Sequence, residues 1–352
     1  MKDRVLRTVA LGIGTALVLV GCAAPDSPSA RPDDRATFSA DSPARGAEAP
    51  LRVGRPAWVS VSVATVWRSP ESPRAVDAPA LENPARISRW LDDMTTDQRR
   101  ALGGRSDTQA LLGDRVVVLE LPKSSPGWAK VVVPSQPTPQ DPRGYPGWVP
   151  VRQLAGEAPV RERRHATVVT RLTWLRADTD EAERLERISF GTELPVVGTT
   201  AEFVRVSAPG GVVARLSRSA VALHAAGRPA LAPTRASLVR TAKMFRGLPY
   251  LWAGTSGFGL DCSGLTSLDY RVHGITIPRD SSPQSENGAA ARPPRPGDLQ
   301  FYATDGKVHH VSMYVGHGRM VHSPGTGQTV EVIATSTPGY AEEYAGARRY
   351  LP

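Results

Sequence analysis

The sequence predicts a multidomain protein in which two small all-β barrels precede an α+β domain. A chain of 352 residues is about twice as long as one typical domain. Its middle part consists of short runs of alternating apolar and polar residues, separated by turn residues at close spacing, as small barrels require. Sustained helical spacing begins only near residue 234 and gives way to strands again. We therefore place the three domains at residues 53–155, 156–228 and 229–352.

The composition excludes several classes of protein. Hydrophobic residues make up 40% of the chain, and beyond the N-terminus no apolar run reaches the roughly 20 residues of a membrane span. A polytopic membrane protein is therefore excluded. The net charge of +9 favours anionic partners, but the basic runs with interleaved aromatic residues that are typical of nucleic-acid binding are missing. His309-His310 lacks the ligand spacing of a zinc site, so we expect neither metal nor cofactor.

The N-terminus has the pattern of an export signal with a lipid-attachment site. A positive start formed by Lys2, Arg4 and Arg7 precedes a mostly apolar stretch. The stretch ends in Leu19-Val20-Gly21-Cys22, which resembles a bacterial lipobox. The resemblance implies that residues 1–22 are a lipoprotein signal peptide. Cys22 would then carry lipid and anchor the protein to the outer face of the cell membrane. The alternatives are an uncleaved signal anchor and a plain secretory signal.

Residues 23–52 are predicted to be a disordered linker. Their Ala, Pro, Ser, Asp and Arg residues offer few large apolar side chains to offset the entropy of folding. A flexible chain of this length spans about 30 Å on average. The folded part is thus expected to work close to a membrane surface.

Two groups of predicted strands follow the linker. The first group begins with the alternation of Val59, Val61 and Val63 against serines and continues through 115–121, 127–133 and 147–154, with a short helical pattern at 90–94. The second group covers 166–175, 191–197, 201–206, 211–216 and 220–223. The segment from Gly191 to Val196 resembles a strand entry of bacterial SH3-like domains. We therefore predict two SH3-like barrels; the alternative is a single β-sandwich over 53–228.

The C-terminal segment combines helices with a small antiparallel sheet. A helical pattern runs from Ser237 to Phe245, and a second helix is expected to start at Cys262, with Asp261 as its cap, and to end at Gly274. Strands are expected at 298–303, 308–315, 319–323 and 329–334. The start of a helix favours thiolate over thiol, so this position is expected to help lower the cysteine pKa.

Cys262 is the candidate nucleophile of the protein. If Cys22 is lipidated, Cys262 has no disulfide partner, and a lone thiol of an exported protein is a candidate reactive group; the alternative is a small buried apolar residue. A cysteine nucleophile needs a base and a group that orients the base. His309, His310 and His322 lie on predicted strands beyond it. Adjacent strand residues face opposite sides, so spacing alone does not choose between His309 and His310.

Four motifs follow one another in this segment. They are Asp261-Cys262-Ser263-Gly264, Pro296-Gly297-Asp298-Leu299, His310-Val311-Ser312-Met313-Tyr314-Val315-Gly316 and Met320-Val321-His322. In this order and spacing they resemble the motifs of NlpC/P60 cell-wall cysteine peptidases. The resemblance covers about 229–352 and implies a papain-like α+β fold with Cys262 as nucleophile, His310 as base and His322 as the orienting residue. It also places Tyr250 beside the nucleophile and implies that Asp261 and Ser263 contribute to substrate binding.

The upstream half resembles the γ-D-glutamyl-L-diamino acid endopeptidases, which carry two SH3-like domains before the catalytic one. The likeness rests on the segments 108–114, 127–131 and 144–149. These enzymes cut peptidoglycan stem peptides between γ-D-Glu and the diamino acid and prefer a free N-terminal L-Ala. The resemblance implies that Asp107 and Tyr145 of the first barrel contact the peptide amine, although the relatives carry Glu at the first position.

Two other functions remain open on the sequence. The protein could be a catalytically silent, wall-binding lipoprotein. The presence of all three of Cys262, His310 and His322 argues against this alternative. The same fold could also act as a cell-wall amidase or acyl transferase. The sequence does not choose between diaminopimelate and lysine in the substrate. We expect a monomer that acts on stem peptides in the cell envelope.

Overall fold

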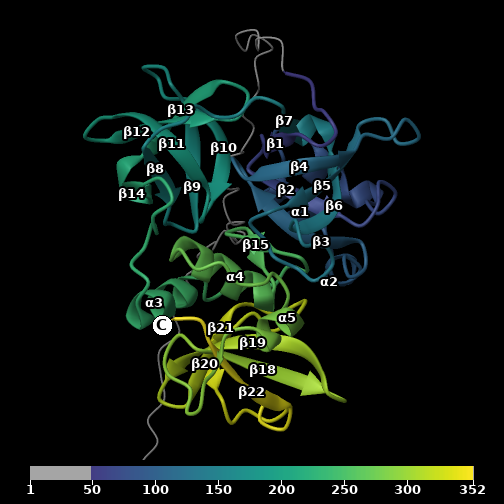
Figure 1. Ribbon diagram of the computed structural model, residues 1–352, viewed down its shortest axis with the longest axis vertical. Coiled ribbons are helices and arrows are strands. Elements are labelled where there is room, and N and C mark those ends of the chain that lie inside the picture. Colours follow the sequence, from purple (N-terminus) through teal and green to yellow (C-terminus); the bar gives the residue numbers. More distant parts are fainter. Residues whose placement is uncertain (1–48, 352) are drawn as a thin grey trace, which may run out of the picture. The chain divides into compact units, whose positions relative to one another are not determined.

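The computed structural model describes residues 49–351 (Figure 1). The predictions for the signal peptide, for Cys22 and for nearly all of the linker lie outside the described residues. Among the residues described, no helix is both long and apolar enough to cross a membrane.

The first β domain is a seven-stranded antiparallel sheet with the strand order β3-β2-β6-β5-β4-β1-β7. Its strands are β1 (Pro56–Val59), β2 (Val63–Trp67), β3 (Ser106–Leu111), β4 (Arg115–Glu120), β5 (Trp128–Val133), β6 (Tyr145–Pro150) and β7 (Leu154–Ala155). Between β2 and β3 lie a 3₁₀ helix (Ala75–Leu81), α1 (Ile87–Asp93) and α2 (Thr96–Arg100).

Two predicted strands of this domain are divided in the structure. The alternating valines do not form one strand, because β1 ends at Val59 and β2 begins at Val63. The intervening Ser62 is buried, and its backbone N–H donates to the Glu186 carboxylate at 2.9 Å instead of pairing in the sheet. The predicted strand 147–154 likewise ends at Pro150, followed by a 3₁₀ turn and the short β7.

The second β domain is a separate seven-stranded antiparallel sheet in the order β10-β9-β13-β12-β11-β8-β14. Its strands are β8 (Arg164–Val168), β9 (Leu172–Ala177), β10 (Arg184–Ser189), β11 (Glu193–Thr199), β12 (Phe203–Ala208), β13 (Val212–Ser217) and β14 (Val221–Ala225). The predicted strand 166–175 is therefore two strands. Each of the two sheets is built from one continuous stretch of the chain, and their apolar side chains belong to different clusters, which contradicts the alternative of a single sandwich.

The C-terminal domain is α+β, as predicted. Its helices are α3 (Arg235–Met244), α4 (Cys262–Val272) and α5 (Ser281–Glu286), and a small ribbon consists of β15 (Thr255–Ser256) and β16 (Gly259–Leu260). The main sheet has the order β17-β22-β18-β19-β20-β21. Its strands are β17 (Ala289–Ala290), β18 (Leu299–Thr304), β19 (Lys307–Gly316), β20 (Arg319–His322), β21 (Glu331–Ala334) and β22 (Tyr344–Arg349). Helix α4 packs against β19, which brings the predicted nucleophile next to the predicted base.

The apolar cores divide unequally among the three domains. Most buried apolar side chains of the first β domain and of the C-terminal domain belong to one continuous cluster, whereas most of the second β domain has a core of its own, which also includes Leu112. Phe190 is an exception. It follows β10 but is fully buried in the shared cluster, where its ring stacks edge-on against Phe245 at a centroid distance of 5.3 Å.

Candidate active site

The first turn of α4 fixes the position of Cys262. Asp261 is the helix N-cap, and its carboxylate accepts a hydrogen bond from the Gly264 backbone N–H at 2.6 Å, an arrangement that stabilises helix starts. The backbone N–H groups of Val311 and Ser263 lie close enough to the Cys262 thiol to favour its charged form. Val311 is the residue of β19 that follows His310.

The position of Cys262 at a helix start suggested a lowered thiol pKa, but its environment has the opposite effect. The residue is only 8% exposed, and burial, followed by the charge of the adjacent Asp261, raises the pKa to about 12. Loss of hydration disfavours the thiolate more than the hydrogen bonds and the nearby Arg279 favour it. The expectation of a lowered pKa is therefore wrong for the substrate-free protein, in which the group is a neutral thiol.

His310 and His322 form a buried hydrogen-bonded pair. The distance between His310 Nε2 and His322 Nδ1 is 2.9 Å, and both side chains are buried. Tyr340 packs on the pair, with its ring centroid 5.5 Å from that of His310 and 4.9 Å from that of His322. The side chain of His309 is 48% exposed. The structure thus resolves the alternative that the sequence left open and makes His310 the partner of His322.

Glu331 is a neighbour of this pair that the sequence did not reveal. It lies opposite His322 in the β20–β21 register, and its carboxylate is 3.3 Å from His322 Nε2. A negative charge there favours the proton on Nε2, which leaves Nδ1 of His322 to accept from His310 Nε2. Nδ1 of His310 is then unprotonated, as a base toward the thiol must be.

His310 is neutral at physiological pH. Burial is the main cause that lowers the pKa of His310 to about 3, with smaller effects from the neighbouring His322 and His309. Burial also lowers the pKa of His322, against the attraction of Glu331. A neutral imidazole beside a neutral thiol is able to accept the thiol proton during attack.

Cys262 and His310 open into one cleft of about 260 Å³. Its lining comprises Tyr250, Cys262, His309, His310, Pro324, Gly339, Tyr340 and Glu343. The predicted nucleophile, base and neighbouring tyrosine thus share a cavity, with His322 behind His310. The side chain of His309 is exposed but also borders the cleft. Within residues 49–351, no group of three or more His, Cys, Asp or Glu is arranged to hold a metal ion.

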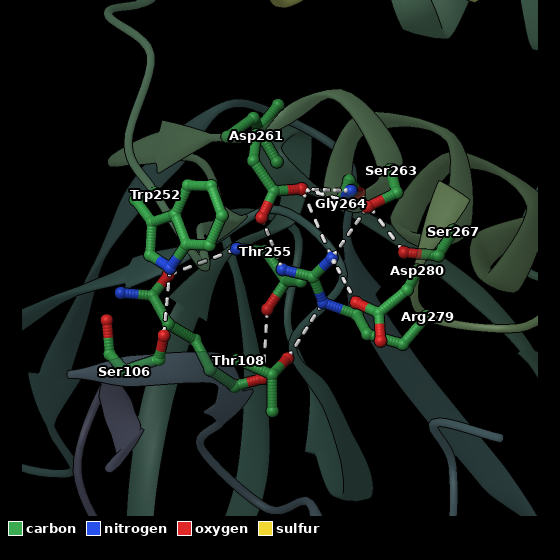
Figure 2. A network of polar contacts seen from close by, with 12 residues as sticks. Ser106, Thr108, Trp252, Thr255, Asp261, Ser263, Gly264, Ser267, Arg279 and Asp280 are labelled. Atoms are coloured by element: carbon green, nitrogen blue, oxygen red, sulfur yellow. Dashed lines mark hydrogen bonds and ion pairs between the residues drawn. The ribbon is translucent and has the colours of Figure 1, made fainter. Parts of the chain in front are cut away.

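A fully buried arginine connects the helix cap to the first β domain (Figure 2). The Arg279 guanidinium donates to Asp261 at 2.6 and 3.1 Å, to the Ser263 hydroxyl at 3.0 Å and to the Thr108 hydroxyl of β3 at 2.9 Å. Asp261 and Ser263 are thereby committed to a buried ion-pair network; their roles in substrate binding stay predictions. Arg279 itself was missed, because no local pattern distinguishes it from a surface arginine.

The turn after Tyr250 is another contact between these domains. The Trp252 indole N–H donates to the Ser106 carbonyl at 2.9 Å, as Figure 2 shows. Ala253 has a φ of 64°, a conformation that favours glycine. Gly254 is needed for space, because a Cβ atom there would lie 2.5 Å from the Gly259 carbonyl oxygen.

Asp107 and Tyr145 come together with a second acidic residue, Asp280. The Tyr145 hydroxyl donates to the Asp280 carboxylate at 2.9 Å, and Asp107 pairs with Arg68 at 2.8 Å. Burial raises the pKa of Asp280 despite the nearby Arg279, and the charge of Asp107 adds to this rise. None of the three residues lines the cleft; Asp280 lies 3.8 Å from Arg279, which pairs with Asp261, the residue before Cys262. Asp280 was missed because it lies outside the motifs that the sequence analysis identified.

Comparisons with known proteins agree with this geometry. Residues 247–349 match the NlpC/P60 family, and residues 168–224 match the YKFC SH3b2 domain. The chain is 44% identical to a γ-D-glutamyl-L-lysine dipeptidyl-peptidase of Bacillus cereus, over 84% of this chain and 91% of the relative. It is 35% identical to the protein of the same name from Bacillus subtilis, over 82% and 96% of the two chains.

Among solved structures, an NlpC/P60 family protein from Bacillus cereus superposes with a TM-score of 0.79 and 42% identity, over 84% of this chain and all of that one. These matches confirm the predicted fold class, and the match over 168–224 confirms an SH3-like domain in the second sheet. The positions of the individual site residues rest on the geometry described above. The chain belongs to the NlpC/P60 family of cysteine peptidases.

Proposed function

We propose that this protein hydrolyses the bond between γ-D-Glu and the diamino acid of peptidoglycan stem peptides that have a free N-terminal L-Ala. The observation that carries the proposal is the cleft itself. A buried thiol and a neutral imidazole share it, and Asp107 and Tyr145 of the first β domain lie near Asp280 of the C-terminal domain. The names of the two Bacillus relatives, which cover most of the chain, support the same bond.

The residues of the cleft account for both halves of the reaction. His310 takes the thiol proton while Cys262 sulfur attacks the γ-carbonyl carbon of D-Glu. As the C–N bond breaks, His310 returns the proton to the departing amine of the diamino acid, and an acyl-enzyme remains. A water molecule, activated by the same imidazole, then hydrolyses the thioester and frees the thiol. His322 orients His310 throughout.

The acidic residues near the cleft give the proposed preference for a free amine its physical basis. Burial raises the pKa of Asp280, and the charge of Arg279 offsets this rise only in part. The ammonium group of a free N-terminus would add a positive charge beside this carboxylate. We therefore assign the amine of L-Ala to Asp107, Tyr145 and Asp280.

Product analysis on defined peptides tests this function. L-Ala-γ-D-Glu-L-Lys and its Nα-acetylated form would be incubated with the enzyme and with Cys262→Ala. We expect release of free lysine from the first peptide, about 10–100-fold slower release from the second, and none with the variant. Cleavage at another amide, or transfer without hydrolysis, would favour the amidase or acyl-transferase alternative.

The proposed location is the outer face of the cell membrane, with Cys22 as the lipidated residue. The pattern of the first 22 residues supports it, and the substrate of the family lies in the cell wall. Incorporation of a radiolabelled fatty acid into the protein, but not into Cys22→Ala, is the expected result. Equal labelling of both would exclude lipid attachment at this cysteine.

A further inference from the structure

One side of the cleft has no role in the mechanism described above. Tyr250 lies on the side of Cys262 near Asp261, since it forms a β-bridge with Leu260, the residue before Asp261. His309, Tyr340 and Glu343 border the cleft near His310. If the acyl part of the peptide extends from Cys262 toward the first β domain, the departing diamino acid extends toward these residues.

We propose that Glu343, held by His309 and Thr304, binds the side-chain ammonium group of the diamino acid. This inference rests on the proposed function, because it assigns the leaving side of the same scissile bond. Of the described residues that line the cleft, Glu343 is the one with a carboxylate, and none is Lys or Arg. Its side chain is 37% exposed, which leaves an oxygen accessible to a ligand.

The carboxylate of Glu343 is held in place before any substrate binds. It accepts a hydrogen bond from the Thr304 hydroxyl at 3.1 Å, and its second oxygen lies 3.2 Å from His309 Nε2. The backbone is also fixed, because Glu343 N–H donates to the Gly339 carbonyl at 3.2 Å and the Glu343 carbonyl accepts from Ala303 N–H at 2.8 Å. A charged group positioned in this way loses little freedom on binding a cation.

The neighbouring surface suits the rest of a lysine side chain. Tyr340 and Pro324 border the same cleft, and their rings can cover the four methylene groups of the stem while the ammonium group reaches the carboxylate. Diaminopimelate carries a second carboxylate beside its terminal amine. This carboxylate would lie close to Glu343 and be repelled by it. The site is therefore expected to select lysine over diaminopimelate with a free carboxylate.

The test compares two peptides that differ only in the ammonium group, L-Ala-γ-D-Glu-L-Lys and L-Ala-γ-D-Glu-L-norleucine. Both keep the scissile bond and the N-terminal amine. For the full-length enzyme we expect kcat/KM to be about 10-fold higher for the lysine peptide, which corresponds to about 1.4 kcal/mol. Glu343→Gln keeps the size and the hydrogen bond from Thr304, and should reduce this ratio to about one to two.

A matched control removes a carboxylate from the adjoining hairpin turn. Asp305 is exposed and has a φ of 50°, a conformation that asparagine also tolerates. Asp305→Asn should therefore keep the tenfold ratio of kcat/KM. If this variant lost the ratio, negative charge in this region would act without contacting the substrate, and the proposal would be contradicted.

The outcomes separate the two proposals. Cleavage of both peptides by the wild-type enzyme at equal rates would overturn the role of Glu343 and leave the proposed function intact; this comparison needs no variant to fold. A ratio unchanged in Glu343→Gln would overturn it as well. A diaminopimelate peptide cleaved faster than the lysine peptide would overturn the charge selection. If neither peptide were cleaved at the γ-D-Glu bond, the proposed function would fail and this inference with it.

Discussion

The two β domains have the same number of strands, but they contact the C-terminal domain through different chemistry. The first contributes polar groups: Thr108 accepts a hydrogen bond from Arg279, and the side chain of Gln109 accepts from the backbone N–H of Thr255 at 3.1 Å. The second contributes mainly apolar surface. Phe190 enters the shared core, and Gly191 lies so close to Leu268 that a Cβ atom would be 2.7 Å from its Cδ1 atom.

This difference indicates separate roles for two similar folds. Polar contacts of the first β domain lead from β3 through Arg279 to the cap of the helix that carries Cys262. The second β domain packs against α3 and α4 through apolar contacts, and it contributes no residue to the lining of the cleft. Since function depends on the site and not on the fold, we expect changes in the first domain to alter peptide cleavage and changes in the second to alter stability alone.

The largest effect is expected for Arg279→Met. The substitution leaves Asp261 buried without its cation, and breaking a buried ion pair in this way costs about 3–5 kcal/mol. It also removes the link from Thr108 to the helix cap. We expect a lower free energy of unfolding in urea and a loss of kcat that remains under conditions where the variant is folded. Full activity in the folded variant would show that this network does not position Cys262.

Phe190→Ala is the corresponding change in the second β domain. Removing a fully buried phenylalanine costs about 3–5 kcal/mol, so the Tm should fall strongly, whereas the ratio of kcat/KM for free and Nα-acetylated peptides should stay constant. Phe203→Ala, at a half-buried position of the same domain, is the control and should cost less. A changed ratio in folded Phe190→Ala would contradict the division of roles.

The sequence revealed the parts of the protein that local patterns encode. The helix cap Asp261, the start of the helix at Cys262 and the strands β18 and β19 were all predictable, because capping and alternation signals are local. The match to the family model then confirmed the fold class.

Residues that act through distant contacts were not predictable in this way. Arg279 and Asp280 derive their roles from a domain more than 100 residues away in the sequence. The pKa of Cys262 is raised because burial outweighs the favourable effect of the helix start on the thiolate. Strand β10 escaped notice because Arg184–Ser189 is rich in charged residues, and one of these, Glu186, is used at the contact with Ser62.

A smaller effect is expected for Asp107→Asn, which tests the first β domain without disturbing its core. The substitution keeps the size of the side chain but removes the charge proposed to attract the L-Ala amine. The preference for free over acetylated peptide should fall by about 10-fold, through slower cleavage of the free peptide. Asp93→Asn, at another arginine-paired aspartate of this domain, should leave the preference intact. If both variants keep it, Asp107 does not contact the amine.

The smallest effect concerns the contact between the two β domains, where Glu186 accepts a hydrogen bond from the backbone of Ser62. Burial raises the pKa of Glu186 from 4.5 to about 7. Because the folded protein holds this proton more tightly than the unfolded chain, the stabilisation is complete below pH 4.5 and is lost as the pH rises through 7.

Glu186→Gln stays neutral, so between pH 5 and pH 8 the wild type should lose about 1–2 kcal/mol more of its free energy of unfolding than the variant does. Urea titrations of both proteins at the two pH values measure this difference, with Glu183→Gln, an exposed change near the same strand, as control. Parallel pH dependence of the wild type and Glu186→Gln would mean that the contact between the domains opens enough to hydrate the carboxylate.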